Sequence, residues 1–506
     1  MLGTVSTIFS NFLYSYLPYL VIFLMSLFMP ADTDLGWHLK YGEYFSKIGK
    51  VLKENILSLE MSGYKWPNIS WLTDFLTYQI YHQAGFLGLS IAGAVVIVFI
   101  FFFVDRALKM SFWEKAFIFP LLFYLELPLL EVSFRGQLLS LLLTSVLVYI
   151  LSAYQRGEKK TIYFAAILFL VWANIHGGFL LGLGLLSMFY ALSQVKYLTI
   201  KDVKQFRESL RYLPAIIFSF LATLVNPHSI EIYLEAARHF GNPYQKYIVE
   251  WVALPAFSSL WWLLFFWGIF LIFNIRMIIS SKKFIQYFEW IMIAGVFYFL
   301  SHWMRRYAWT MYLVSVPVII AYFRSIKPAY NSFSGKAVPI AILSGMYLYS
   351  LIYHIPRQRL NFMNWDRFCA DYIKCSSESA EFLKNNILPG KFLSFYNWGG
   401  WLIWNYPQIK PSIDGRMHLW RDEKGYSAFA EYYFLEQDVT DIEESDYDVV
   451  YMWSEKPLFN KMIKLSDQGK WRTVYKDDRA GIFVRVTDST AGGYGTTRES
   501  ESDLLK

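Results

Sequence analysis

The chain has 506 residues, of which 55% are hydrophobic, 20% are aromatic and only 17% are charged. A soluble protein carries about 25% charged residues, so this composition excludes an ordinary soluble protein. The net charge of +7 comes mostly from short basic loops between apolar segments, and no soluble segment combines a basic patch with aromatic residues. We therefore expect no nucleic-acid partner.

The chain divides into three parts of different composition. Residues 1–356 contain repeated apolar stretches of about 20 residues, the length that crosses roughly 30 Å of hydrocarbon. Residues 357–487 have the composition of a globular domain, and residues 488–506 form a polar tail that we expect to be flexible. The sequence therefore predicts a polytopic α-helical membrane protein with a C-terminal α/β domain.

The loops between the apolar stretches alternate in charge. Every second loop is rich in Lys and Arg, and such loops stay in the cytoplasm. The remaining loops and the C-terminal domain then lie on the extracytoplasmic side of the cell (plasma or inner) membrane. The eleven predicted spans cover residues 11–30, 86–104, 116–131, 137–154, 161–175, 178–194, 213–226, 258–275, 285–301, 307–323 and 337–354.

In this topology the polar clusters gather on the extracytoplasmic side. All eight histidines of the chain fall in outer loops, at outer span ends or in the C-terminal domain. Histidine and aromatic residues are common at membrane interfaces, but the inner loops carry Lys and Arg without histidine or acid clusters. Ionisable groups at a membrane edge are functional candidates, so we expect a site on the outer side.

Two carboxylates, Asp32 and Asp34, directly follow the first span in the segment MPADTDLGWHLKYG and open an outer loop at residues 31–83. Pro30 indicates that the first helix has ended, and an extended stretch at 31–35 would point both carboxylates to the same side. Such a pair either holds Mg²⁺ or Mn²⁺ or supplies a general base and a positioning group. A pair of solvated loop acids is the alternative.

Three arginines near outer span ends are candidates for binding a phosphate: Arg135, Arg305 and Arg306. The planar guanidinium matches the geometry of a phosphate group. Adjacent residues on a helix do not share a face, so we expect only one of the tandem arginines to point into a site. Interfacial anchoring, or a bond from Arg135 to Glu131, is the alternative.

Three histidines complete the candidate set for binding the substrate: His38, His176 in NIHGG and His228 in NPHSIEIY. The two glycines after His176 allow a close approach of the backbone. A structural hydrogen bond is the alternative role for each histidine.

The C-terminal domain alternates strand and helix patterns, which is typical of an α/β layer. The predicted strands are KFLSF, KPSIDG and DVVYMW, the predicted helices are WGGWLIWNY, YSAFAEYYFLEQ and PLFNKMIKLSDQG, and WRTVYKD with AGIFVRV forms a closing hairpin. Asp414 and Arg416 follow a predicted strand, where α/β folds place ligand groups, or else form a structural salt bridge. Cys369 and Cys375 either form a small disulfide or stay free.

Acids and arginines around one outward-facing cavity suit the transfer of a sugar from a polyprenyl phosphate. The incoming group needs a base, and the departing phosphate needs cations. The segments DTDLGWHLKYGEY, WANIHGGF, NPHSIEIY and NWGGWLIWNYP with PSIDGRMHLW resemble membrane glycosyltransferases of the GT-C fold. This group includes protein mannosyltransferases, aminoarabinose transferases and oligosaccharyltransferases, and the resemblance is closest to a prokaryotic GT-C-like group.

The resemblance implies a hexosyl- or pentosyltransferase that uses a polyprenyl-phosphate-linked sugar and a lipid, glycan or protein acceptor. Asp32 and Asp34 match the position of the catalytic acids. The acceptor-binding W-W-D-Y-G element of oligosaccharyltransferases has only a faint counterpart in YNWGGW (396–401), and the adjacent-acid pattern of many mannosyltransferases is absent.

Two other functions remain open from the sequence. A transporter or flippase for lipid-linked sugars would carry ionisable residues within its spans, and Glu126 and Glu131 in the third predicted span are of this kind. A non-catalytic membrane scaffold would instead present the C-terminal domain to a partner.

Overall fold

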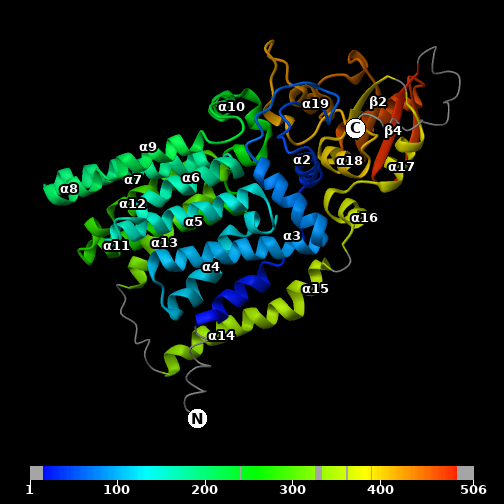
Figure 1. The fold of residues 1–506 in the computed structure, drawn as a ribbon. Coiled ribbons are helices and arrows are strands. Elements are labelled where there is room, and N and C mark those ends of the chain that lie inside the picture. The colour runs from blue at the N-terminus through cyan, green and yellow to red at the C-terminus, as the bar shows by residue number, and fades with distance from the viewer. Residues whose placement is uncertain (1–14, 240, 325–332, 361–362, 389, 487–506) are drawn as a thin grey trace.

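The structure, a computed structural model, describes residues 15–239, 241–324, 333–360, 363–388 and 390–486. A body of helices is followed by a smaller domain with a β-sheet, and helix α2 (Leu35–Ile48) lies between the two (Figure 1). The predicted polar tail at 488–506 and the start of the first predicted span lie outside the described residues.

The helical body contains one helix at Ser15–Met25 and a series of labelled helices. These are α2, α3 (Trp71–Leu108), α4 (Phe112–Leu130), α5 (Gly136–Gln155), α6 (Phe164–Ile175), α7 (Phe179–Ile200), α8 (Val203–Ser209), α9 (Tyr212–Thr223), α10 (Glu231–His239), α11 (Ser259–Ser280), α12 (Phe288–Trp303), α13 (Ala308–Phe323), α14 (Phe333–Tyr349) and α15 (Ile355–Gln358).

Many of these helices have the length and composition of membrane spans. Among the described residues, six are long and apolar enough to cross a membrane, and two shorter ones are also apolar. The six cover Trp71–Leu108, Gly136–Gln155, Phe179–Ile200, Ser259–Ser280, Phe284–Trp303 and Ala337–Gln358. Each predicted span overlaps a helix of the structure, whereas the crossing of the membrane by all eleven stays a prediction.

Helix α3 is broken at Gly85, between the first predicted outer loop and the second predicted span. Gly85 has φ +58° and ψ −151°, a conformation that only glycine adopts readily. The break separates residues 71–84, which pack against α2, from the apolar run at 86–108. Gly42 of α2 approaches this first part of α3 so closely that an added Cβ would lie 2.2 Å from the carbonyl oxygen of Asp74.

The C-terminal domain is built on a four-stranded sheet with the order β1-β2-β4-β3. Strand β1 (Lys391–Ser394) is parallel to β2 (Tyr447–Trp453), and β4 (Ala480–Arg485) is antiparallel to both β2 and β3 (Trp471–Lys476). Its helices include α16 (Trp365–Arg367), α17 (Ser377–Asn385), α18 (Gly399–Asn405), α19 (Ala428–Glu436) and α20 (Pro457–Asp467). The prediction of an α/β layer with a closing hairpin is confirmed.

The predicted strand KPSIDG is wrong. The backbone carbonyls of Pro411 and Ser412 instead accept hydrogen bonds from Leu59 and Glu60 of the first loop, at 2.9 Å and 3.0 Å. Pro411 has no N–H to donate, so it fits a short edge contact better than a strand within a sheet. This contact ties the C-terminal domain to the loop that follows α2.

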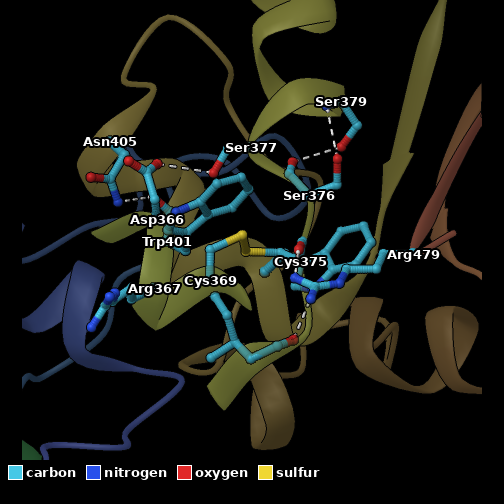
Figure 2. The surroundings of a disulfide bond; sticks show 12 residues. Asp366, Arg367, Cys369, Cys375, Ser376, Ser377, Ser379, Trp401, Asn405 and Arg479 are labelled. Atoms are coloured by element: carbon cyan, nitrogen blue, oxygen red, sulfur yellow. Dashed lines mark hydrogen bonds between the residues drawn. A yellow bond between two sulfur atoms is a disulfide. The ribbon is translucent and has the colours of Figure 1, made fainter. Parts of the chain in front are cut away.

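Cys369 and Cys375 form a disulfide, with their Cα atoms 4.9 Å apart. Figure 2 shows the bond in its surroundings, where Arg479 donates a hydrogen bond of 3.2 Å to the carbonyl of Cys375. Disulfides persist in oxidising compartments. The placement of this domain on the extracytoplasmic side stays a prediction.

The two parts of the molecule meet through glycines. A Cβ built on Gly36 of α2 would lie 1.8 Å from the carbonyl oxygen of Gly400 in α18, and one built on Gly400 would lie 2.7 Å from the carbonyl oxygen of Thr33. The two backbones are in direct contact, and any larger residue would force them apart. The C-terminal domain is thereby held against the turn that carries the acid pair.

Candidate active site

Asp32 and Asp34 share one guanidinium, that of Arg135. The Nε atom of Arg135 lies 3.2 Å from Asp32 Oδ2, and one of its terminal nitrogens lies 3.2 Å from Asp34 Oδ2. Arg135 has extended backbone angles and precedes the first residue of α5. The acids come from the turn before α2, so two segments far apart in sequence form the pair of ion pairs.

An extended stretch at 31–35, the condition considered for the acid pair, is not found at Asp34, which has φ −87° and ψ −10° and occupies the N-cap position of α2. The N–H of Asp34 donates to Asp32 Oδ1 at 3.0 Å, a local bond that favours a turn over an extended chain. The two carboxylates still converge, because both face the same guanidinium.

Burial and the neighbouring charge raise the pKa of Asp34 above that of an ordinary aspartate. Burial is the larger cause and repulsion by Asp32 follows, while Arg135 acts in the opposite direction. A carboxylate with a raised pKa is a stronger base. Asp34 therefore has the environment of a general base held in a fixed position.

His38 of α2 forms a second polar group beside the acids. Its Nδ1 atom lies 2.5 Å from Asp74 Oδ1, and Asn68 donates to the other oxygen of Asp74 at 2.6 Å. Burial alone would lower the pKa of His38, but Asp74, followed by the acid pair, raises it above the usual value. The imidazole ring of His38 stacks on Trp37, with ring centroids 3.6 Å apart.

His176 follows the last residue of α6 and is neutral. Its Nδ1 atom accepts the N–H of Gly178 at 3.1 Å and lies 2.8 Å from Ser140 Oγ. The proton of the ring must then be on Nε2. Burial, with Arg306 and Arg135, lowers the pKa of His176 to about 3, so this side chain offers an N–H donor rather than a positive charge.

Of the tandem arginines, Arg306 is the one connected to the site. Its guanidinium lies over the ring of Trp251, 4.8 Å from the centroid. Burial lowers the pKa of Arg306, Glu250 opposes this, and the charge of Arg135 adds to it. The Arg306 guanidinium has no salt bridge within the described part of the chain. The backbone N–H of the neighbouring Arg305 donates to the carbonyl of Val252.

Two of the predicted substrate-binding residues are paired with each other and buried. Asp414 and Arg416 form an ion pair at 2.6 Å, and other N–H groups of Arg416 donate to Tyr41, Asn55 and Ser58. The side chain of Arg416 is 0% exposed, so a phosphate does not reach this guanidinium. We therefore assign the pair to the contact between the domains, which is the salt-bridge alternative.

His228 and Arg135 also differ from the expected arrangement. His228 is buried, and burial together with Lys53 lowers its pKa to about 4. The electrostatic neighbours of His228 belong to the first loop and to Glu231, not to the acid pair. Arg135, expected at the donor phosphate, is paired with the acids.

Sequence reasoning missed Glu250 altogether. Glu250 lies in a short 3-10 helix, Val249–Trp251, between α10 and α11 and acts electrostatically on Arg135, Arg306 and His418. No apolar period, motif or second acid marks this position in the sequence. Asp74 and His418 stand in polar clusters that the sequence does show, SWLTD and IDGRMHLW.

The acid pair does not make a ready metal site. No group of three or more His, Cys, Asp or Glu side chains that would hold a metal ion occurs within the described ranges. The guanidinium of Arg135 also lies between the two carboxylates and neutralises much of the charge that would attract Mg²⁺ or Mn²⁺. The arrangement does not fit the predicted metal, so we derive no step through one.

The chain matches no protein-family profile and no curated protein sequence. Its fold is similar to that of the Archaeoglobus fulgidus oligosaccharyltransferase. The apo crystal structure has a TM-score of 0.51 at 10% identity, over 88% of this chain and 70% of that one. The crystal structure tethered through a disulfide bond to an acceptor peptide with the NVT sequon has a TM-score of 0.52 at 10% identity, over 97% and 75%.

This likeness establishes the fold. The expected resemblance to the GT-C group agrees with this likeness in fold, and six helices among the described residues are long and apolar enough to cross a membrane. The narrower resemblance to one prokaryotic group stays a prediction.

Proposed function

We propose that the protein is a membrane glycosyltransferase that transfers a sugar from a polyprenyl-phosphate-type donor to an acceptor on the extracytoplasmic side. The observation that carries the proposal is that one site contains both a side chain suited to act as a base and a cation suited to bind a phosphate. Asp34 has the surroundings of a base, and Arg306 is a partly buried cation without a salt bridge among the described residues.

The reaction needs few groups. An oxygen or nitrogen of the acceptor attacks the anomeric carbon of the sugar, and the bond from that carbon to the phosphate oxygen breaks. Asp34 receives the proton of the acceptor, while Asp32 and Arg135 hold Asp34 in place. The phosphate leaves with its bonding electrons and an added negative charge, which Arg306 and the Nε2–H of His176 offset.

The topology belongs to the proposal. Eleven helices would cross the cell (plasma or inner) membrane, with the acid turn, the cations and the C-terminal domain on the outer side. A protein acceptor is the first choice, because the similar oligosaccharyltransferase was crystallised with an acceptor peptide.

A transporter of lipid-linked sugars is the second candidate, and one residue favours it. Glu126 in α4 is 2% exposed, and neither of its carboxylate oxygens has a hydrogen-bond partner within the described structure. Polar groups buried in a membrane are costly and are commonly functional. A transporter moves its substrate without consuming it, which separates the two candidates.

Arg306→Gln is expected to weaken binding of a polyprenyl phosphate by about 10-fold or more, the effect of losing one charge-assisted hydrogen bond. The measurement is equilibrium binding of a fluorescent polyprenyl phosphate to the protein in lipid nanodiscs. Arg357→Gln is the matched control, because Arg357 also lies over an aromatic ring, that of Tyr353, outside the site. Equal affinity of both variants and the unmodified protein would exclude Arg306 as the phosphate ligand.

A further inference from the structure

The segment 413–418 of the C-terminal domain lies directly against the acid turn. A Cβ built on Gly415 would lie 1.7 Å from Asp34 Oδ1 and 2.7 Å from its carboxyl carbon. The carbonyl of Gly415 faces two side chains of its own domain, since Tyr396 donates to it at 3.3 Å and His418 Nδ1 lies 2.7 Å away. Gly415 is therefore held from one side and touches the carboxylate on the other.

The residues on either side of Gly415 fix the segment to the first loop. Arg416 is 2% exposed and donates a hydrogen bond of 2.7 Å to the hydroxyl of Tyr41, which lies on α2. Arg416 also donates 3.0 Å to Asn55, and Ser58 of the same loop donates to Asp414. The segment is thus bonded to the helix that begins at Asp34.

Helix α18 supports the same segment from behind. A Cβ on Gly399 would lie 2.5 Å from the carbonyl oxygen of Ile413 and 2.6 Å from the Cβ of Asp414. Its neighbour Gly400 touches the backbone of Thr33. The beginning of α18 therefore packs against both the segment and the acid turn. It holds Gly415 close to the Asp34 carboxylate.

We propose that residues 414–416 position the carboxylate of Asp34, with Gly415 as the positioning residue, so that the C-terminal domain forms one wall of the active site. The inference rests on the proposed function for its effect on catalysis. Its structural part, the contact between Gly415 and Asp34, stands independently of the substrate. Any side chain at position 415 displaces the carboxylate from the place where Arg135 and Asp32 hold it.

The test uses the full chain with Gly415→Ala, Asp34→Ala and the double variant, and Gly295→Ala as control. An added Cβ at Gly295 meets nothing within 4 Å. Gly415→Ala is expected to reduce transfer by about 100-fold, the effect of misplacing a catalytic group by about 1 Å. It should also lower the midpoint of thermal unfolding, and this loss should vanish in the Asp34→Ala background, where the carboxylate is gone.

Full activity of Gly415→Ala together with loss of activity in Asp34→Ala would overturn the positioning role and leave the proposed function intact. An equal shift of the unfolding midpoint in both backgrounds would overturn the contact itself. Full activity of Asp34→Ala would instead contradict the proposed function, while the unfolding measurement would still decide on the contact. Gly295→Ala should match the unmodified protein in both measurements.

Discussion

Asp34→Asn is expected to reduce sugar transfer by about 10³-fold, because an amide cannot accept the proton of the acceptor and general base catalysis contributes about 10²- to 10⁴-fold. The change is nearly isosteric, so the fold should persist. Since burial and Asp32 raise the pKa of Asp34, activity of the unmodified protein should fall with decreasing pH, starting above the range of an ordinary aspartate. Asp32→Asn should reduce the rate of transfer less, because Asp32 holds Asp34 in place and does not accept the proton.

The measurement is the initial rate of transfer in nanodiscs, with circular dichroism and thermal unfolding to verify the fold. Asp446→Asn is the matched control, because the Asp446 side chain is 72% exposed and forms a salt bridge with Lys391, away from the acid pair. Unchanged rates in both Asp34→Asn and Asp32→Asn would show that the acid pair is not catalytic.

Arg416→Ala is expected to destabilise the protein by about 3–5 kcal/mol, the cost of leaving one partner of a buried ion pair uncompensated. Both side chains of the pair with Asp414 are 0% exposed, and the change also removes bonds to Tyr41, Asn55 and Ser58. The measurement is thermal unfolding, in which a loss of this size lowers the midpoint by roughly 3–5 °C for a chain of this length. Arg472→Ala is the matched control, since Arg472 is exposed on strand β3.

Combining Arg416→Met with Asp414→Leu tests the cause of that loss. The double change removes both charges. It should therefore reduce the free energy of unfolding less than Arg416→Ala alone if the uncompensated carboxylate of Asp414 is the main cause of the loss. A loss below about 1 kcal/mol for Arg416→Ala would mean that the pair does not hold the domains together.

The membrane part of the fold could be predicted because its signal is local. Apolar runs in the sequence mark the six helices that are long and apolar enough to cross a membrane among the described residues. The break of α3 at Gly85 was not predicted. The segment KPSIDG could not be assigned in this way. Its partner is the stretch 59–60 of the first loop, and no local pattern shows that two such distant segments meet.

In the candidate site, too, only the residues with a local sequence signal could be predicted. Asp32 and Asp34 stand out because charges next to an apolar run are costly. Their pairing with Arg135 requires the turn before α2 to lie beside the start of α5, an arrangement in space that no local sequence pattern shows. Glu250 has no local signal at all, since its place near the site depends on the course of the chain between α10 and α11, where it lies in a short 3-10 helix. The contact of Gly415 with Asp34 is visible only in three dimensions.

The most direct test of the central claim is turnover of a defined donor. The purified protein in nanodiscs is incubated with a panel of polyprenyl-phosphate and polyprenyl-pyrophosphate sugars and with peptide, glycan and lipid acceptors, with and without MnCl₂. We expect one donor class to yield a glycosylated acceptor and an equal amount of free lipid phosphate, detected by mass spectrometry. In proteoliposomes, which separate two compartments, donor that crosses the bilayer but stays intact with every acceptor would contradict the transferase and support the transporter.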